Sequence, residues 1–217
     1  MEKKKEHIFF STIIGFLYIS LLYLDCFSNK YLDTYQLKYG IIWILFLETT
    51  FSLLGKGYPC VWRNWLWKLR FAVLIADFYF LFTPYNAAGI GGYLVVQLIY
   101  WERLTFCQHR EKDKKNKLLV IEFVILILLT GIGIFFGNYI IYILGLVYGF
   151  VLFYNLKTVW EDYFKGEEEL IYLALSLTLL ALCDSSILLN FIWNKELIGN
   201  LIWCFYVPSQ LLLANYE

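Results

Sequence analysis

Two aspartates lie inside apolar runs of the chain, in the segments LIADFYF and ALCDSSILLN. A charged residue near the middle of a bilayer costs roughly 2.5–3.5 kcal/mol on insertion scales, so carboxylates are rare in membrane helices. Asp77 and Asp184 are therefore candidates for a functional role. Two carboxyl groups that share one poorly solvated cavity do not both ionise easily, and a protonated acid beside a carboxylate suits general acid–base hydrolysis.

A purely structural role would explain the same two residues. Aspartates in membrane bundles often bond Ser, Tyr or Asn side chains of a neighbouring helix and hold the helices together. Glu48 is a third carboxylate inside an apolar run, whereas Glu102 and Glu122 lie near expected helix ends and can reach water. The remaining polar candidates for a cavity, each equally typical of a helix–helix hydrogen bond, are Gln97, Tyr100, Asn190, Tyr206 and Gln210.

The elements that would position these residues are membrane helices. The 217 residues are 60% hydrophobic, well above the share of about 45–50% in soluble domains. A helix needs about 20 apolar residues to cross the hydrocarbon core. The apolar runs predict eight such spans, at 8–26, 39–55, 65–83, 86–107, 118–136, 139–156, 170–192 and 197–215. We expect an all-α, polytopic membrane bundle with one transmembrane domain over 1–217.

The loop charges predict the orientation of the chain. The start MEKKKEH is followed by a long apolar run without a small-residue cleavage site, which indicates a retained first helix. With the N-terminus in the cytoplasm, only Lys30, Lys38 and Lys195 lie on the opposite side, and the other fifteen of the 18 basic residues are cytoplasmic. An even number of spans places the C-terminus in the cytoplasm too.

This topology predicts that the two aspartates lie at a similar depth. The spans 65–83 and 170–192 run in the same direction, and each aspartate comes seven or eight residues before the outer end of its span. At 1.5 Å rise per residue, both carboxylates would lie roughly 10–12 Å below the outer surface. Adjacent helices would bring both into one cavity.

Several other kinds of site are disfavoured. A formal net charge of zero gives no reason to expect a nucleic-acid partner. His7 and His109, the two histidines, lie outside the membrane spans, so a buried Ser–His or metal–His site is not expected. The five cysteines are scattered without metal-ligand spacing and predict neither a disulfide framework nor a zinc site. We expect no cofactor and no metal.

Short motifs in several expected helices resemble those of the YhhN/lysoplasmalogenase family of integral membrane proteins. They are Leu37-Lys38-Tyr39, Ala76-Asp77 with Leu81, GIGGYLVVQLIY over 89–100, Cys183-Asp184 with SSILLNF, and FYVPSQLLLA near the C-terminus. The order of these motifs along the chain matches the family, and both aspartates fall on family motifs. Two positions depart from the pattern, because Gln97 stands in place of a histidine and Ala76 in place of a glycine.

The resemblance implies an ether hydrolase that cleaves the vinyl ether bond of lysoplasmalogen lipids. It implies Asp77 and Asp184 as the acid–base pair, with Lys38, Tyr100 and Gln210 as cavity or head-group residues. Glutamine does not exchange a proton near neutral pH, so Gln97 leaves a changed substrate or a lost activity open. The expected partners are a lysolipid substrate and membrane lipids. The composition suggests the inner membrane of a bacterial cell.

Two further functions fit the sequence. One is a non-catalytic lipid-binding or transporter-like bundle that uses the aspartates for protons or a cation. Transporters of this kind have broken helices at the site, and the apolar runs show no obviously broken pair. The other is a membrane sensor, which would need an attached output domain, and the chain shows none.

Overall fold

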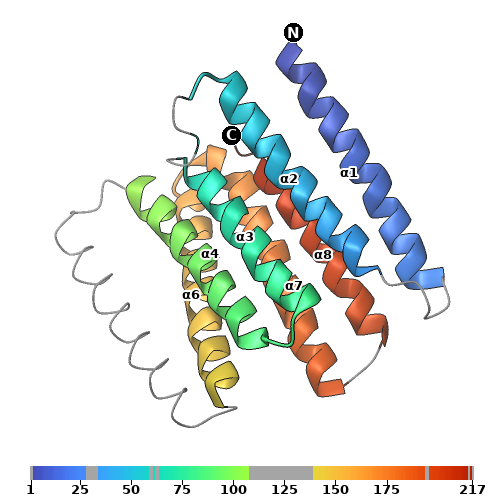
Figure 1. Ribbon diagram of the computed structural model, residues 1–217. Helices are drawn as coiled ribbons and strands as arrows, with labels where there is room; N and C mark the ends of the chain where they lie inside the picture. Colours follow the sequence, from blue (N-terminus) through green and yellow to red (C-terminus); the bar gives the residue numbers. More distant parts are fainter. Residues whose placement is uncertain are drawn as a thin grey trace. The chain divides into compact units, whose positions relative to one another are not determined.

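The computed structural model describes residues 2–27, 34–58, 61, 64–107, 139–193, 196–214 and 216. These residues form helices and no strands, which confirms the expected all-α class (Figure 1). The α-helices are α1 (Glu2–Phe27), α2 (Tyr35–Gly55), α3 (Trp65–Phe82), α4 (Asn86–Cys107), α6 (Tyr139–Phe164), α7 (Ile171–Trp193) and α8 (Glu196–Ala214). A short 3-10 helix, η2 (Glu168–Leu170), precedes α7.

Most helix ends lie within a few residues of the expected spans. The largest difference is α6, which continues eight residues beyond the expected end at 156. The expected end marked where apolar character stops, but the helix continues to Phe164. Gly166 follows the helix end with a positive φ of 107°, a conformation that suits glycine there. The fifth expected span, 118–136, lies outside the described residues.

Three described helices are long and apolar enough to cross a membrane: Tyr35–Gly55, Ile141–Phe164 and Glu168–Asn190. Shorter apolar helical stretches cover Thr12–Asp25 and Leu201–Ala214. The structure therefore supports a helical membrane protein, with fewer clear spans than the eight expected. The charges of α3 explain part of the difference, because Lys68, Arg70 and Asp77 all lie in its 18 residues.

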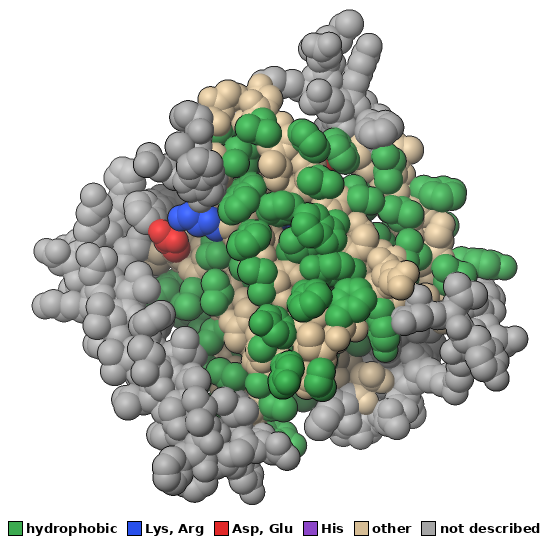
Figure 2. Space-filling view, viewed as in Figure 1, with side chains coloured by type: hydrophobic (Ala, Val, Ile, Leu, Met, Phe, Trp, Pro, Cys, Tyr) green, Lys and Arg blue, Asp and Glu red, His purple; other side chains and the backbone are tan. Residues whose placement is uncertain are grey.

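The surface of the described residues is rich in large apolar side chains. On α6, Leu146, Phe150 and Phe153 follow one another at helical spacing and are 64–75% exposed. Figure 2 shows mainly hydrophobic side chains over the described part of one face, with acidic and basic groups visible only in small areas. Water would disfavour such a surface, whereas lipid tails would solvate it.

The chain divides into two compact units. Unit 1 comprises Met1–Arg70 and Val159–Glu217, and unit 2 comprises Phe71–Thr158. In unit 1, α7 and α8 form the most extensive helix pair, and α1 packs on α2 and α8. Unit 2 contains most of α3, all of α4 and the first part of α6.

A tight hairpin joins α3 to α4 in unit 2. Pro84 lies in the three-residue connection, where it ends the helix as the sequence predicts. The two helices approach closely at Gly92, because a Cβ atom added there would lie 2.8 Å from Cβ of Ala76. Small residues at both positions thus allow the backbones to meet, which brings the side chains around Asp77 against α4.

A proline inside α8 is compensated from α1. Pro208 has no backbone N–H to donate to the carbonyl of Cys204, four residues earlier. The Tyr18 hydroxyl donates a hydrogen bond of 3.2 Å to that carbonyl. This contact satisfies a backbone group that lipid could not, and it holds α1 against α8.

Candidate functional site

Asp77 is a buried carboxylate of unit 2, with 7% of its surface exposed. It lies in the middle of α3, and the hydroxyl of Tyr93 on α4 donates a 2.6 Å hydrogen bond to its Oδ1. Distances of 2.5–2.7 Å are typical of hydroxyl donors to a charged acceptor. The α3–α4 hairpin makes this contact possible, because it places Ala76, which precedes Asp77, directly against Gly92, which precedes Tyr93.

A second polar pair follows one helical turn along α4. Gln97 and Asn155 are both 0% exposed. The Asn155 side-chain amide donates to the backbone carbonyl of Gln97 at 2.8 Å and to Gln97 Oε1 at 3.0 Å. A backbone carbonyl can only accept, so the Asn155 nitrogen must face it, and the side-chain atom of Gln97 that meets this nitrogen must be its oxygen.

Three buried polar atoms, two in this amide pair and one in a neighbouring side chain, have no hydrogen-bond partner among the residues that the structure describes. They are Gln97 Nε2, Asn155 Oδ1 and the indole nitrogen of Trp101. Trp101 lies four residues after Gln97 and so on the same face of α4, and its ring meets Tyr154 of α6 edge-on at 6.4 Å. Tyr100, predicted as a cavity residue, is fully buried beside them in the chain.

Asp184 lies in α7, in unit 1, and is partly exposed. Its helix pairs with α8 through two serines, since Ser209 donates to the Ser176 backbone carbonyl at 2.9 Å. Asn190 lies farther along α7 and is half-buried. The two aspartates thus belong to different units, and their common cavity stays a prediction.

Gln210 of α8 binds a buried arginine. The guanidinium of Arg70, 2% exposed, donates to the Gln210 side-chain oxygen and, at 2.5 Å, to the Gln210 backbone carbonyl. Gln210 therefore offsets part of the free-energy cost of burying the charged guanidinium, with its side-chain oxygen turned toward Arg70. This contact links α3 to α8 within unit 1, and the predicted substrate contact of Gln210 stays a prediction.

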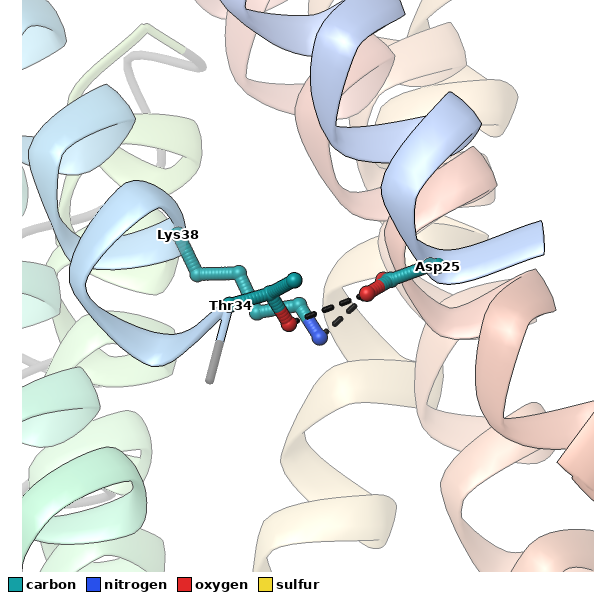
Figure 3. Close-up of polar contacts among 3 residues, drawn as sticks. All are labelled: Asp25, Thr34 and Lys38. Atoms are coloured by element: carbon teal, nitrogen blue, oxygen red, sulfur yellow. Dashed lines mark hydrogen bonds and ion pairs between the residues drawn. The ribbon is translucent and has the colours of Figure 1, made fainter. Parts of the chain in front are cut away.

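Lys38 lies in a different polar cluster, at the N-terminal end of α2 (Figure 3). Its ammonium pairs with Asp25 of α1 at 3.0 Å, and Thr34 donates to the same carboxylate at 2.9 Å. The ammonium also lies 5.3 Å from the centroid of Trp203, whose ring packs edge-on against Tyr206 at 5.2 Å. Lys38 thus links α1 and α2 and reaches the aromatic face of α8.

The predicted residues therefore form two groups. Asp77, Gln97 and Tyr100 lie in unit 2, while the others lie in unit 1: Asp184, Lys38, Asn190, Tyr206 and Gln210. Tyr93, Asn155 and Arg70 were not among the predicted site residues, although each contacts one. Tyr93 could have been found from its spacing, because it lies one turn before Gln97 on α4 and opposite Asp77 across a short hairpin.

The chain offers no established relative from which these roles could be taken over. Comparison with family models, with curated proteins and with solved structures finds no match to it. The described residues contain no group of three or more His, Cys, Asp or Glu side chains that could hold a metal ion. The resemblance to the lysoplasmalogenase family accordingly remains a hypothesis.

Proposed function

We propose that this protein is a membrane-embedded hydrolase that cleaves the vinyl ether bond of a lysoplasmalogen-type lysolipid. The single observation that carries the proposal is the placement of Asp77. It is a buried carboxyl group that accepts a hydrogen bond from the Tyr93 hydroxyl, and Tyr93 lies one helical turn from Gln97, whose side-chain amide has unused hydrogen-bonding capacity. Acid–base groups held in a poorly solvated site are typical of hydrolases.

The chemistry needs an acid and a base but no metal. The protonated member of the Asp77–Asp184 pair transfers its proton to the outer carbon of the vinyl ether, which gives an oxocarbenium ion. The ionised member stabilises that cation and takes a proton from an attacking water, which gives a hemiacetal. Collapse of the hemiacetal releases a fatty aldehyde and the glycerophospho-alcohol, so that one water is consumed for each bond broken.

In this scheme Tyr93 is a positioning residue. Its hydroxyl holds one oxygen of Asp77 and leaves the carboxyl group in a defined orientation. The ring is itself fixed, because it lies edge-on to Tyr148 of α6 at 6.4 Å and against Phe80 at 5.9 Å. A rotation of the hydroxyl away from Asp77 would therefore require movement of several aromatic rings.

A non-catalytic lipid-binding protein is the second candidate. The Tyr93–Asp77 hydrogen bond is also what a packing role of Asp77 predicts, since both side chains satisfy each other across the hairpin. Gln97 also favours a lipid-binding protein, because an amide at this place binds ligands but does not exchange protons near neutral pH. The two candidates differ in one measurable property, the release of an aldehyde.

The membrane topology belongs to the same proposal. Tyr93 meets Tyr148, and Trp101 meets Tyr154. Residue numbers therefore increase in the same direction along α4 and α6, so the two helices are parallel. We propose the eight spans that the apolar runs predict, with both termini on the cytoplasmic side of a bacterial inner membrane.

Aldehyde release by the purified full-length protein in detergent tests the function. In D2O, the fatty aldehyde should carry one deuterium on the carbon next to the carbonyl, because the first step protonates that carbon. Glu48→Gln serves as the matched control, since Glu48 is also a buried carboxylate of a membrane helix but has no part in the proposal. No aldehyde from folded protein with several head groups would contradict the hydrolase and favour the lipid-binding protein.

A further inference from the structure

The amide pair Gln97–Asn155 has hydrogen-bonding capacity that the described structure does not use. After the two bonds from Asn155, Gln97 retains both N–H groups of Nε2, and Asn155 retains the lone pairs of Oδ1. Leaving a buried donor or acceptor unsatisfied costs about 1–3 kcal/mol, and buried polar groups in native proteins are rarely left so. Something other than the described side chains is expected to bind here.

The chemistry of the free atoms restricts the ligand. Two donors, Gln97 Nε2 and Trp101 Nε1, require an acceptor, whereas Asn155 Oδ1 requires a donor. A 3.0 Å hydrogen bond joins Asn155 Nδ2 to Gln97 Oε1, and each side-chain amide adds the distance between its own nitrogen and oxygen. Gln97 Nε2 and Asn155 Oδ1 therefore lie at most about 8 Å apart. An alcohol hydroxyl both donates and accepts, so its chemistry matches both demands.

The ligand group should also be uncharged. Amide and indole groups carry no net charge, so they would supply no counter-charge to a buried ion. Tyr93 lies one turn before Gln97 on α4 and donates to Asp77 of α3, and a carboxylate disfavours a phosphate or a second carboxylate nearby. The large aromatic rings of Trp101 and Tyr154 add apolar contact area beside the amide pair.

We propose that Gln97, Asn155 and Trp101 form a buried binding site for the alcohol hydroxyl of a glycerol-containing ligand. The ligand is the glycerol unit of a lysolipid or a free polyol, which present the same chemistry. The requirement for a hydroxyl does not rest on the proposed hydrolysis; only the choice of a lysolipid as the main probe does.

The test compares two lipids that differ at one hydroxyl. The probes are a 1-O-alkyl lysophosphatidylcholine, which has no vinyl ether to cleave, and its 2-O-methyl analogue. Wild-type full-length protein in detergent should bind the hydroxyl lipid about 10- to 100-fold more tightly, as loss of a hydrogen bond in a buried site predicts. Free glycerol is titrated in parallel as the soluble probe.

The double variant Gln97→Met with Asn155→Leu removes both amides together. It should bind both lipids with equal affinity and unfold at the same or a higher temperature, because replacing both partners by apolar groups removes buried unsatisfied atoms. Gln36→Met is the matched control, since Gln36 is exposed on α2 and its change should leave the preference intact. The single variant Asn155→Leu, which leaves Gln97 Oε1 without its donor, should unfold at a lower temperature.

Each outcome decides the matter. Selective binding of the hydroxyl lipid that disappears in the double variant supports the site with a lysolipid as its ligand. Protection against unfolding by glycerol alone, lost in the same variant, supports the site with a soluble polyol as its ligand. Equal affinity of wild type for both lipids without protection by glycerol, or a preference that survives in the double variant, overturns the proposal. Asp77→Asn separates the two proposals, because it should abolish aldehyde release and keep the hydroxyl preference.

Discussion

The Tyr93 hydroxyl and the Asp77 carboxylate meet at 2.6 Å across the α3–α4 hairpin. The contact depends on three features that lie close together in the chain: a proline that ends α3, a short connection, and a glycine–alanine approach one residue away from the pair. A polar interaction in the middle of apolar helices is thus built from local sequence. It makes unit 2 the place where the acid–base proposal can be tested by small changes.

Tyr93→Phe removes the hydroxyl and keeps the ring. The buried carboxylate loses a charge-assisted donor, so we expect the free energy of unfolding in detergent to fall by about 2 kcal/mol and aldehyde release to fall with it. Tyr172→Phe on the exposed side of α7 controls for the chemical change alone. Unchanged stability and activity of Tyr93→Phe would show that the hydrogen bond has no role in holding Asp77.

Gly92→Ala adds one methyl group at the closest approach of α3 and α4. The new Cβ would lie 2.8 Å from Cβ and 3.0 Å from Cα of Ala76, and backbone must move to admit it. Overpacking of this kind costs about 1–3 kcal/mol, which thermal or denaturant unfolding measures directly. Gly91→Ala is the matched control, because its Cβ meets nothing within 4 Å and the helix gains from alanine. Equal effects of the two changes would contradict the close approach.

Tyr18 and Pro208 are expected to be coupled. Tyr18→Phe leaves the Cys204 carbonyl without the hydroxyl donor and should cost about 1 kcal/mol. Pro208→Ala restores a backbone N–H four residues after Cys204, so the same tyrosine change should cost less in that background. A double-mutant cycle measures the difference. Strict additivity of the two changes would rule out the proposed compensation.

Gln210→Leu should destabilise the protein through Arg70. The buried guanidinium loses its side-chain acceptor and keeps the bond to the backbone carbonyl, for an expected loss of about 2 kcal/mol in the free energy of unfolding. The exposed Gln36→Leu controls for the same change of residue type. A stable Gln210→Leu variant with weakened lysolipid binding would instead place Gln210 at the ligand, as the sequence alone suggested.

Helix positions were largely predictable, whereas helix partners were not. Breaks such as Pro84 and the sharp change from apolar to charged residues mark the ends of α3, α4 and α7 to within a residue or two. The end of α6 was missed because a helix does not stop where its apolar run stops. The pairing of Gln97 with Asn155 depends on how α4 and α6 are rotated about their axes, which a pattern of apolar residues does not specify.

The candidate site was predicted in part for the same reason. Lone polar residues in apolar runs stand out, so Asp77, Gln97 and Gln210 were found from sequence, and all three prove to be buried. Their roles depend on the opposing side chain. Gln210 meets a charged guanidinium and Lys38 meets Asp25, contacts that hold helices together. The ligand contacts predicted for both residues stay predictions.

We propose that Asp77 and Asp184 act together on one substrate. The most direct measurement is the rate of aldehyde release from a lysoplasmalogen by wild type, Asp77→Asn, Asp184→Asn and the double variant, each confirmed as folded by its unfolding transition. Residues that act as a unit give strongly non-additive losses, so each single variant should be as inactive as the double one. Release at the wild-type rate from either single variant would contradict the account.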